Sequence, residues 1–335
     1  MEFFTGFEAC GSNNDVASLF DYVYAIPVLS SAGGFYETQG MQLSNSYGHV
    51  MKKCDPGKTK VVGGHVSNLS TQSLYYNFKV RGYFIVGFKI GDDEIQIVNW
   101  STTNEIRVYK NGTGTLLATG GTRLSTALHH VEVKIFSDDT NGSIHMKING
   151  SDDYILEATD INTGGGDITE IYWGNNGGST CVWDNIFIAD DWKGQVRSFL
   201  LSPESDDTLD FTPSEGADGY AMINEKDGHD GDSSYVWGDI IGQQGLHGYE
   251  EVPDSIIIKG MSITTVARKT DVSDRKLKTI VKYNDTLYEL GENDLLSYYP
   301  QNEEQGISYS IDEAPDATEL TKEKIDSMKI GYQVA

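Results

Sequence analysis

The fold of this chain is decided by the run Leu128-His129-His130-Val131-Glu132-Val133-Lys134-Ile135 and by the run Gly142-Ser143-Ile144-His145-Met146-Lys147-Ile148-Asn149-Gly150. Apolar residues stand at every second position in both runs: Val131, Val133 and Ile135 in the first, Ile144, Met146 and Ile148 in the second. Such alternation is typical of strands with one buried face. Turn-forming residues at 138–142 join the runs, so we expect an antiparallel hairpin whose six apolar side chains lie in a core.

Further strands are predicted on both sides of this hairpin. Residues 72–90 are rich in aromatic and β-branched side chains, and Phe84, Val86, Phe88 and Ile90 share one face at their end. Shorter strands are expected at 94–98, 105–109, 116–119, 154–157, 168–173 and 180–189. No segment before residue 190 shows helical periodicity over more than two turns. Strands that follow one another roughly every eight to twelve residues predict an antiparallel sandwich.

The second part of the chain also favours strands. A strand is predicted at 256–267, and residues 279–283 and 286–289 flank Asn284-Asp285 as a hairpin. Thr321 is a predicted N-cap for a helix of at most two turns that contains Ile325 and Met328. The predicted class is all-β, with an N-terminal antiparallel jelly-roll sandwich in residues 1–190. A second β-rich domain with a short C-terminal helix follows in residues 191–335.

Charge limits the partners. The chain has 25 Lys and Arg against 50 Asp and Glu, a formal net charge of −25. A nucleic-acid surface needs clustered basic residues, and an anionic membrane repels an acidic protein, so we expect neither partner. Solubility is the other explanation of this charge.

The start of the chain and its cysteines indicate a cytoplasmic site of synthesis. Residues 1–8 are acidic and do not resemble a signal peptide, and no run approaches the ~18 apolar residues of a membrane span. Cys10, Cys54 and Cys181 are widely spaced and fit no zinc or disulfide pattern. We expect reduced thiols, with a Cys10–Cys181 pair after lysis as the alternative.

No catalytic pattern is present. Retaining glycosidases of one sandwich branch carry Glu-x-Asp-x-x-Glu on a strand, where two acids flank the scissile bond. Residues 292–297 lack the last acid and residues 157–160 have the wrong spacing. The seven histidines show no zinc or triad spacing. The chain is therefore predicted not to be an enzyme.

Cofactors are not expected either. The acidic run at 224–232 lacks the order of a calcium loop. We interpret it as a solvated loop, with calcium as the alternative.

Aromatic residues beside amides suggest where a glycan could bind. The candidates are Trp100, Tyr172, Trp173, Asn175 and Asn176. A flat ring stacks on the apolar face of a sugar while amides take its hydroxyls. The favoured alternative is that Trp173 and Trp183 are core residues of adjacent strands and that the Asn/Gly stretch is a loop.

The first part of the chain resembles a known superfamily. The two runs quoted above, together with Val182-Trp183-Asp184-Asn185-Ile186-Phe187-Ile188, resemble the central and closing strands of concanavalin A-like (laminin-G-like) jelly rolls. Many members of that superfamily bind carbohydrate and some cleave it. The resemblance implies the same sandwich as the strand pattern.

The second part resembles a family of tailed-phage virion proteins in which a jelly roll precedes an ordered series of motifs. The matching stretches are 194–203, 209–216, 223–225, 232–236, 256–271 and the helix-containing segment 317–332. Phe211 and Leu320 stand where that family usually has Trp, and Gln195 stands for an acid. No catalytic residues are assigned to those motifs, so none is carried over.

This second resemblance implies a non-enzymatic structural component of a tailed-phage virion, made in the host cytoplasm and exposed on the particle. Capsid decoration, a head fibre, and a tail or baseplate attachment all remain open. The expected partners are other virion proteins and further copies of the chain in a symmetric oligomer. The alternative is a carbohydrate-binding adhesin for a host-surface glycan.

We expect the second domain to make the assembly contact. The candidate residues are Val196, Phe199, Leu200, Leu201 and Phe211. An assembly contact needs an apolar patch rimmed by polar groups. The equal alternative is that these side chains pack the seam between the two domains.

Overall fold

The computed structural model describes residues 2–5, 20–24, 28–30, 40–43, 49–67, 85–100, 105–111, 115–122, 124–125, 127–174, 181–196, 198–225, 233–254, 256–270, 274–295 and 305–335. The chain divides into two compact units between Ser198 and Phe199, called unit 1 and unit 2 below. Strands make up nearly all of the regular structure, and a short helix precedes the last strand. The predicted all-β class is therefore confirmed.

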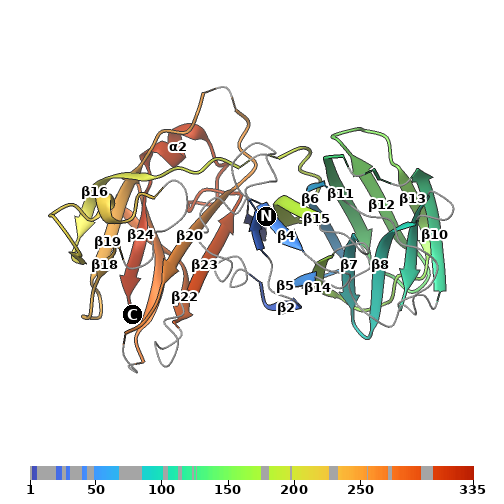
Figure 1. Ribbon diagram of the computed structural model, residues 1–335, viewed down its shortest axis with the longest axis horizontal. Coiled ribbons are helices and arrows are strands. Elements are labelled where there is room, and N and C mark those ends of the chain that lie inside the picture. The colour runs from blue at the N-terminus through green and yellow to red at the C-terminus, as the bar shows by residue number, and fades with distance from the viewer. Residues whose placement is uncertain are drawn as a thin grey trace. The chain divides into compact units, whose positions relative to one another are not determined.

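Two antiparallel sheets form the described part of unit 1 (Figure 1). Sheet A has the order β13-β12-β11-β6-β15-β4-β3, and β1 also pairs with β15. Its strands are β1 (Phe3–Thr5), β3 (Val28–Ser30), β4 (Gly40–Leu43), β6 (Thr59–Ser67), β11 (His129–Phe136), β12 (Gly142–Ile148), β13 (Leu156–Ile161) and β15 (Cys181–Ala189).

Sheet B has the order β10-β9-β8-β7-β14-β5-β2. Its strands are β2 (Tyr22–Tyr24), β5 (His49–Gly57), β7 (Val86–Ile90), β8 (Asp93–Trp100), β9 (Glu105–Lys110), β10 (Thr115–Thr122) and β14 (Ile168–Gly174). Of the strand predicted at 72–90, residues 72–84 lie outside the described part of the chain. The two sheets place their apolar faces in one core, as the alternating sequence predicts.

The β11–β12 hairpin has the predicted register. Val133 lies opposite Met146 and Ile135 lies opposite Ile144. Val131, Val133, Ile135, Ile144 and Met146 are completely buried, which confirms five of the six predicted core positions. Ile148 is half-buried because it is the last residue of β12, where the chain leaves the sheet. Asn149 (φ 53°) and Gly150 (φ 70°) adopt the left-handed conformation that turns the chain there.

The segment after β15 returns onto unit 1. Val196 packs with Val61, Phe187 and Ala189 on the face of sheet A that points away from Val133. The backbone N–H of Ser198 donates to Asn185 Oδ1 at 2.7 Å. Residues 190–198 therefore belong to unit 1, and the division lies beyond the expected boundary at residue 190.

Unit 2 is built on a five-stranded antiparallel sheet of order β16-β19-β24-β21-β22 (Figure 1). These strands are β16 (Pro203–Leu209), β19 (Gln244–Tyr249), β24 (Lys329–Val334), β21 (Lys276–Tyr283) and β22 (Thr286–Asp294). Two short ribbons accompany the sheet: β17 (Thr212–Pro213) with β18 (Val236–Trp237), and β20 (Met261–Ala267) with β23 (Gln305–Ile311).

The predicted local signals of unit 2 are largely confirmed. β21 and β22 form the expected hairpin, with Asn284 (φ 49°) and Asp285 (φ 58°) both left-handed, as a type I′ turn requires. Thr321 caps the helix α2 (Lys322–Ser327) by accepting from the N–H of Lys324. The strand predicted from Ile256 begins only at Met261, and Ile257 is exposed.

No helix in the described residues is long and apolar enough to cross a membrane.

Candidate functional site

The predicted glycan residues do not form an exposed platform. Trp173 and Tyr172 are completely buried, so the predicted stacking role of these two rings is wrong. Trp173 points into the core beside Phe3 and Phe20, in agreement with the alternative that it is a core residue. Trp100 ends β8 opposite Glu105, and its side chain lies outside the described residues, as do Asn175 and Asn176.

Tyr172 lies on the opposite face of sheet B from Trp173. The hydroxyl of Tyr172 donates to the Glu170 carboxylate. Tyr172, Gly87, Gln96 and Tyr109 are successive cross-strand neighbours and form one row across sheet B. Gln96 and Tyr109 are also buried. Because these groups are covered, this row stabilises the sheet and offers no ring to a ligand.

An exposed aromatic cluster lies instead on the outer face of sheet A. We call it the Tyr154–Trp192 cluster and define it as Lys134, His145, Lys147, Tyr154 and Trp192. Lys134 pairs with His145, and Glu132 pairs with Lys147, across β11 and β12. These side chains lie on the face opposite Val133 and Met146 because neighbouring residues of a strand alternate.

The ammonium group of Lys147 lies near both rings of the cluster. Its Nζ is 5.3 Å from the ring centroid of Tyr154 and 5.1 Å from that of Trp192. The two rings are 6.1 Å apart and inclined by 35°. The ring of His145 is 4.8 Å from that of Tyr154, and Lys134 Nζ is 6.0 Å from the ring of Trp192. The arrangement is a set of three cation–π contacts within one group of aromatic rings.

The sheet holds the two rings differently. The buried carboxylate of Glu132 accepts hydrogen bonds from the backbone N–H groups of Lys193 and Gly194, at 2.9 and 3.1 Å. Trp192 also packs against the apolar group that contains Val61 and Val196. Trp192 is therefore fixed to sheet A. Tyr154 comes from the loop between β12 and β13, and 41% of it is exposed, so its ring is open to a ligand.

Carboxylates surround the cluster at different distances. Asp191 lies 2.8 Å from Lys134, and this hydrogen bond holds the pKa of Asp191 below its usual value. Asp152 lies 3.9 Å from Lys147, and Glu157 lies 3.9 Å from His145. Both of these acids are largely exposed, so their pairs are weak.

The sequence contained part of this cluster. Alternation places Glu132 and Lys134 on the outer face, and the strand predicted at 154–157 begins at Tyr154. In residues 142–150, His145 and Lys147 alternate with the apolar residues, which also places them on the outer face. The position of Trp192 could not be read, because it depends on the return of the chain to sheet A after β15.

The five predicted assembly residues do not share one patch. Val196 is buried in unit 1, whereas Phe211 is buried in the core of unit 2 and Leu201 packs against another core group there. Phe199 is 39% exposed and Leu200 is half-buried. The prediction that all five form one exposed contact is therefore wrong, since Val196 and Phe211 are buried in the interiors of two different units.

A different apolar surface lies in unit 2. Tyr235, Trp237, Ile240 and Ile241 are 45%, 51%, 63% and 70% exposed, and we call them the 235–241 strip. Four large apolar side chains exposed within seven residues are typical of an interaction surface. The sequence signal for this strip is weak, because a ribbon strand of two residues, β18, decides which way these side chains point.

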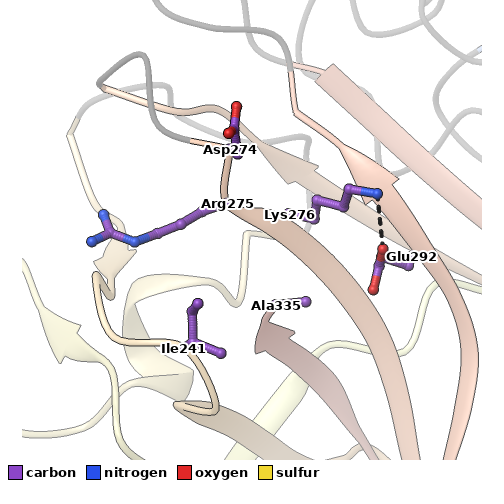
Figure 2. Close-up of a pocket in the computed structure, with 6 residues that line it drawn as sticks. All are labelled: Ile241, Asp274, Arg275, Lys276, Glu292 and Ala335. Carbon is purple, nitrogen blue, oxygen red and sulfur yellow. Dashed lines mark ion pairs between the residues drawn. The ribbon is translucent and has the colours of Figure 1, made fainter.

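A shallow hollow adjoins one end of the strip (Figure 2). Its lining residues are Ile241, Asp274, Arg275, Lys276, Glu292 and Ala335. Lys276 extends toward Glu292 at 3.0 Å, and this hydrogen bond raises the pKa of Lys276 (Figure 2). Because the Glu292 carboxylate engages Lys276 and keeps it protonated, this lysine is not a free amine nucleophile.

Unit 2 also contains an Asp–His–Tyr chain. Asp206 Oδ1 lies 2.8 Å from His247 Nδ1, and His247 Nε2 lies 3.1 Å from the Tyr332 hydroxyl. His247 is completely buried, and burial lowers its pKa and raises that of Tyr332. The chain resembles a catalytic relay in order; its central His247 is buried, Asp206 is partly exposed, and the three residues join β16, β19 and β24.

No group of three or more His, Cys, Asp or Glu residues in the described ranges could hold a metal ion. In the predicted acidic loop only Asn224 and Glu225 are described, and residues 226–232 lie outside the described part. Cys54 and Cys181 are free thiols, and burial raises the pKa of each to about 12. Cys10 lies outside the described residues.

Comparisons with known proteins give a distant likeness in fold. No family model and no curated protein matches the chain. A solved structure of the alginate lyase Aly36B, a mutant in complex with an alginate trisaccharide, is 14% identical, with a TM-score of 0.39 over 57% of this chain and 98% of the enzyme. None of these comparisons supports membership of a phage virion family, which stays a prediction.

Two further solved structures are similar at the same level. Domain 4 of AbnA, an arabinanase of Geobacillus stearothermophilus bound to arabinotriose, is 11% identical, with a TM-score of 0.34 over 55% of this chain and 91% of that domain. The VIP36 exoplasmic/lumenal domain in its Ca²⁺- and mannose-bound form is 10% identical, with a TM-score of 0.30 over 49% of this chain and 82% of that domain. At these scores no residue role is carried over.

Proposed function

We propose that unit 1 is a carbohydrate-binding module and that the Tyr154–Trp192 cluster is its binding site. The observation that carries the proposal is the exposed ring of Tyr154, placed beside Trp192 and Lys147 on the outer face of sheet A. The apolar face of a pyranose stacks on such a ring. The site needs no large rearrangement, because sheet A already holds its second ring.

Polar groups at the edge of the ring supply the other half of sugar recognition. Asp152, Glu157 and His145 lie around Tyr154 and carry oxygen and nitrogen atoms that can bond to sugar hydroxyls. A few placed polar groups around an apolar surface set orientation and specificity. The cluster therefore has both components of a glycan site.

The proposed module binds without cleaving. The support is that the acids near Tyr154, Asp152 and Glu157, stand on separate elements, are largely exposed and lie nearest to Lys147 and His145, so they do not form the paired carboxylates that glycoside cleavage uses. The acids of residues 292–297 lie in unit 2, where Glu292 bonds to Lys276.

A glycan array probed with the full chain and with Tyr154→Ala tests the proposal. The variant should lose binding by about tenfold or more, since stacking on an aromatic ring contributes about 1–3 kcal/mol. Phe136→Ala is the matched control, because Phe136 is a similarly exposed ring on the same sheet. Equal binding by all three proteins, or no binding by any, would reject the module.

A second candidate is the structural component of a virion, for which the 235–241 strip is the supporting observation. An assembly contact buries about 800 Å² per partner around an apolar centre. The test is to complement phage particles that lack the protein with the full chain and with Trp237→Ser/Ile241→Ser. Incorporation of the wild type and not of the variant would support this role, and equal incorporation of both would place the contact elsewhere.

A further inference from the structure

We infer that the ligand of the Tyr154–Trp192 cluster is an acidic glycan, with the carboxylate of a uronic acid placed against Lys147. This inference rests on the proposed function and adds the class of sugar to it. The starting point is that the cation of Lys147 lies close to both aromatic rings, at 5.3 and 5.1 Å from their centroids.

The environment of Lys147 favours an additional anion. Only 18% of its side chain is exposed, and its ammonium group lies near the adjacent rings of Tyr154 and Trp192. Partial removal of water strengthens any charge interaction made there. A carboxylate that reaches Lys147 would therefore gain more than one that meets a lysine in open solvent.

The carboxylates of the protein leave room for such a ligand. Within the described residues, Asp152 is the acid within ion-pair distance of Lys147, at 3.9 Å, and it is fully exposed. A pair of that kind contributes about 0–1 kcal/mol and is easily exchanged. Glu132, which pairs with Lys147 across the strands, directs its carboxylate to the backbone of Lys193 and Gly194.

A second cation extends the same surface. Lys134 Nζ lies 6.0 Å from Trp192, and it is bonded to Asp191 at 2.8 Å. Lys134 is therefore already neutralised by a close carboxylate, whereas Lys147 is not. The difference makes Lys147 the residue that selects an acidic sugar and makes Lys134 the matched control.

The geometry combines both kinds of contact on one monosaccharide. A uronic acid carries its carboxylate at the edge of a pyranose ring, so the ring can stack on Tyr154 while the carboxylate points to Lys147. A neutral hexose would make the same stacking contact without the charge interaction. We expect uronate oligomers to bind about tenfold more tightly than neutral oligomers of the same length, a difference of about 1.4 kcal/mol.

Isothermal titration of the full chain with short oligouronates and with neutral oligomers of the matching sugars tests the inference. Lys147→Met keeps an unbranched stem beside the rings and removes the charge, so it should abolish the roughly tenfold preference for uronate oligomers over neutral oligomers. Lys134→Met should keep most of the preference. Thermal melts of both variants check that the fold is retained.

The outcomes separate the two proposals. Equal affinity for uronate and neutral oligomers, or an unchanged preference in Lys147→Met, would overturn the acidic ligand while Tyr154-dependent binding upheld the module. Sulfated neutral oligomers that bind as tightly as uronates would also overturn it, since charge alone and not the carboxylate would then be selected. Absence of any Tyr154-dependent binding would reject the module itself.

Discussion

Units 1 and 2 use the same kind of secondary structure to make two different interiors. In unit 1, large side chains such as Trp173, Trp183 and Phe187 are completely buried, and every residue of β15 is buried on both faces. In unit 2, the two apolar groups contain mostly residues that keep a few per cent of their surface, with partly exposed side chains packed around them. Both units leave some large apolar side chains exposed, but in unit 2 four of them stand within seven residues, in the 235–241 strip.

Charge sharpens this difference. Residues 199–250 contain twelve acidic residues and one lysine, and the 235–241 strip lies within this stretch. An apolar strip in such an acidic segment stays soluble by repulsion between copies and leaves itself open to a partner with a basic rim. Unit 1 presents the Tyr154–Trp192 cluster on a broad sheet, while unit 2 presents the 235–241 strip beside a ribbon of two short strands.

The largest effect is expected in the core of unit 1. Trp183→Ala should lower the free energy of unfolding by about 3–5 kcal/mol, because it empties a completely buried site and removes the bond from Nε1 to the Gly174 carbonyl at 3.2 Å. The loss of stability in each unit can be measured by urea unfolding, with hydrogen exchange of peptides from that unit as the readout. Leu116→Ala, an exposed change in unit 1, should alter stability by less than about 0.5 kcal/mol.

If Trp183→Ala opened peptides of unit 2 as strongly as those of unit 1, the two interiors would not be independent. The units would then unfold together, and their interiors could not be treated as separate cores.

Acid should destabilise unit 1 through two buried histidines. His65 and His130 lie 4.9 Å apart, and burial lowers their pKa values from 6.5 to about 4 and about 3. Below pH 6.5 the unfolded chain binds protons that the folded unit does not, so stability is full above that pH and falls as the pH approaches 4 to 3. The expected loss is on the order of 3 kcal/mol per histidine.

His130→Phe isolates this effect, because it keeps a ring beside His65 and cannot titrate. The loss of stability between pH 7 and pH 4, measured by urea unfolding, should be smaller in the variant than in the wild type by roughly 3 kcal/mol. An identical loss in both proteins would mean that carboxylates or unit 2 cause the acid sensitivity. In unit 2 burial lowers the pKa of His247, and Asp206 counteracts only part of this shift.

A moderate effect is expected from the buried polar chain of unit 2. Asp206 accepts from the N–H groups of Gly219 and Tyr220 at 2.7 and 2.8 Å and also bonds to His247. Asp206→Asn should cost about 2 kcal/mol in unit 2, since an amide cannot accept all of these bonds with both of its ends. Glu132→Gln is the counterpart in unit 1 and should cost less, about 1 kcal/mol, because one oxygen accepts both backbone bonds.

Much of the fold was predictable because it depends on local alternation. The β11–β12 register, the Asn284-Asp285 turn and the Thr321 cap all follow from neighbouring residues. The Tyr154–Trp192 cluster could not be predicted from the sequence. Its two rings come together only because the chain returns to sheet A after β15. The prediction that Tyr172 and Trp173 are exposed failed for a related reason. Adjacent aromatic residues on a strand point to opposite faces of the sheet, and both faces of β14 are covered at these positions.

The smallest effect on stability is expected from the 235–241 strip, and it tests whether unit 2 holds apolar side chains outside its core. Trp237 and Ile240 are 51% and 63% exposed, so Trp237→Ser/Ile240→Ser removes little buried area and should change the free energy of unfolding by less than about 0.5 kcal/mol. The same variant should bind less of an apolar dye and elute earlier from a hydrophobic column. Phe211→Ser is the contrasting change, because Phe211 packs edge-on against Tyr332 in the core. A loss of about 2 kcal/mol or more in the double variant would mean that the strip stabilises unit 2 itself, and its exposure would no longer indicate a partner.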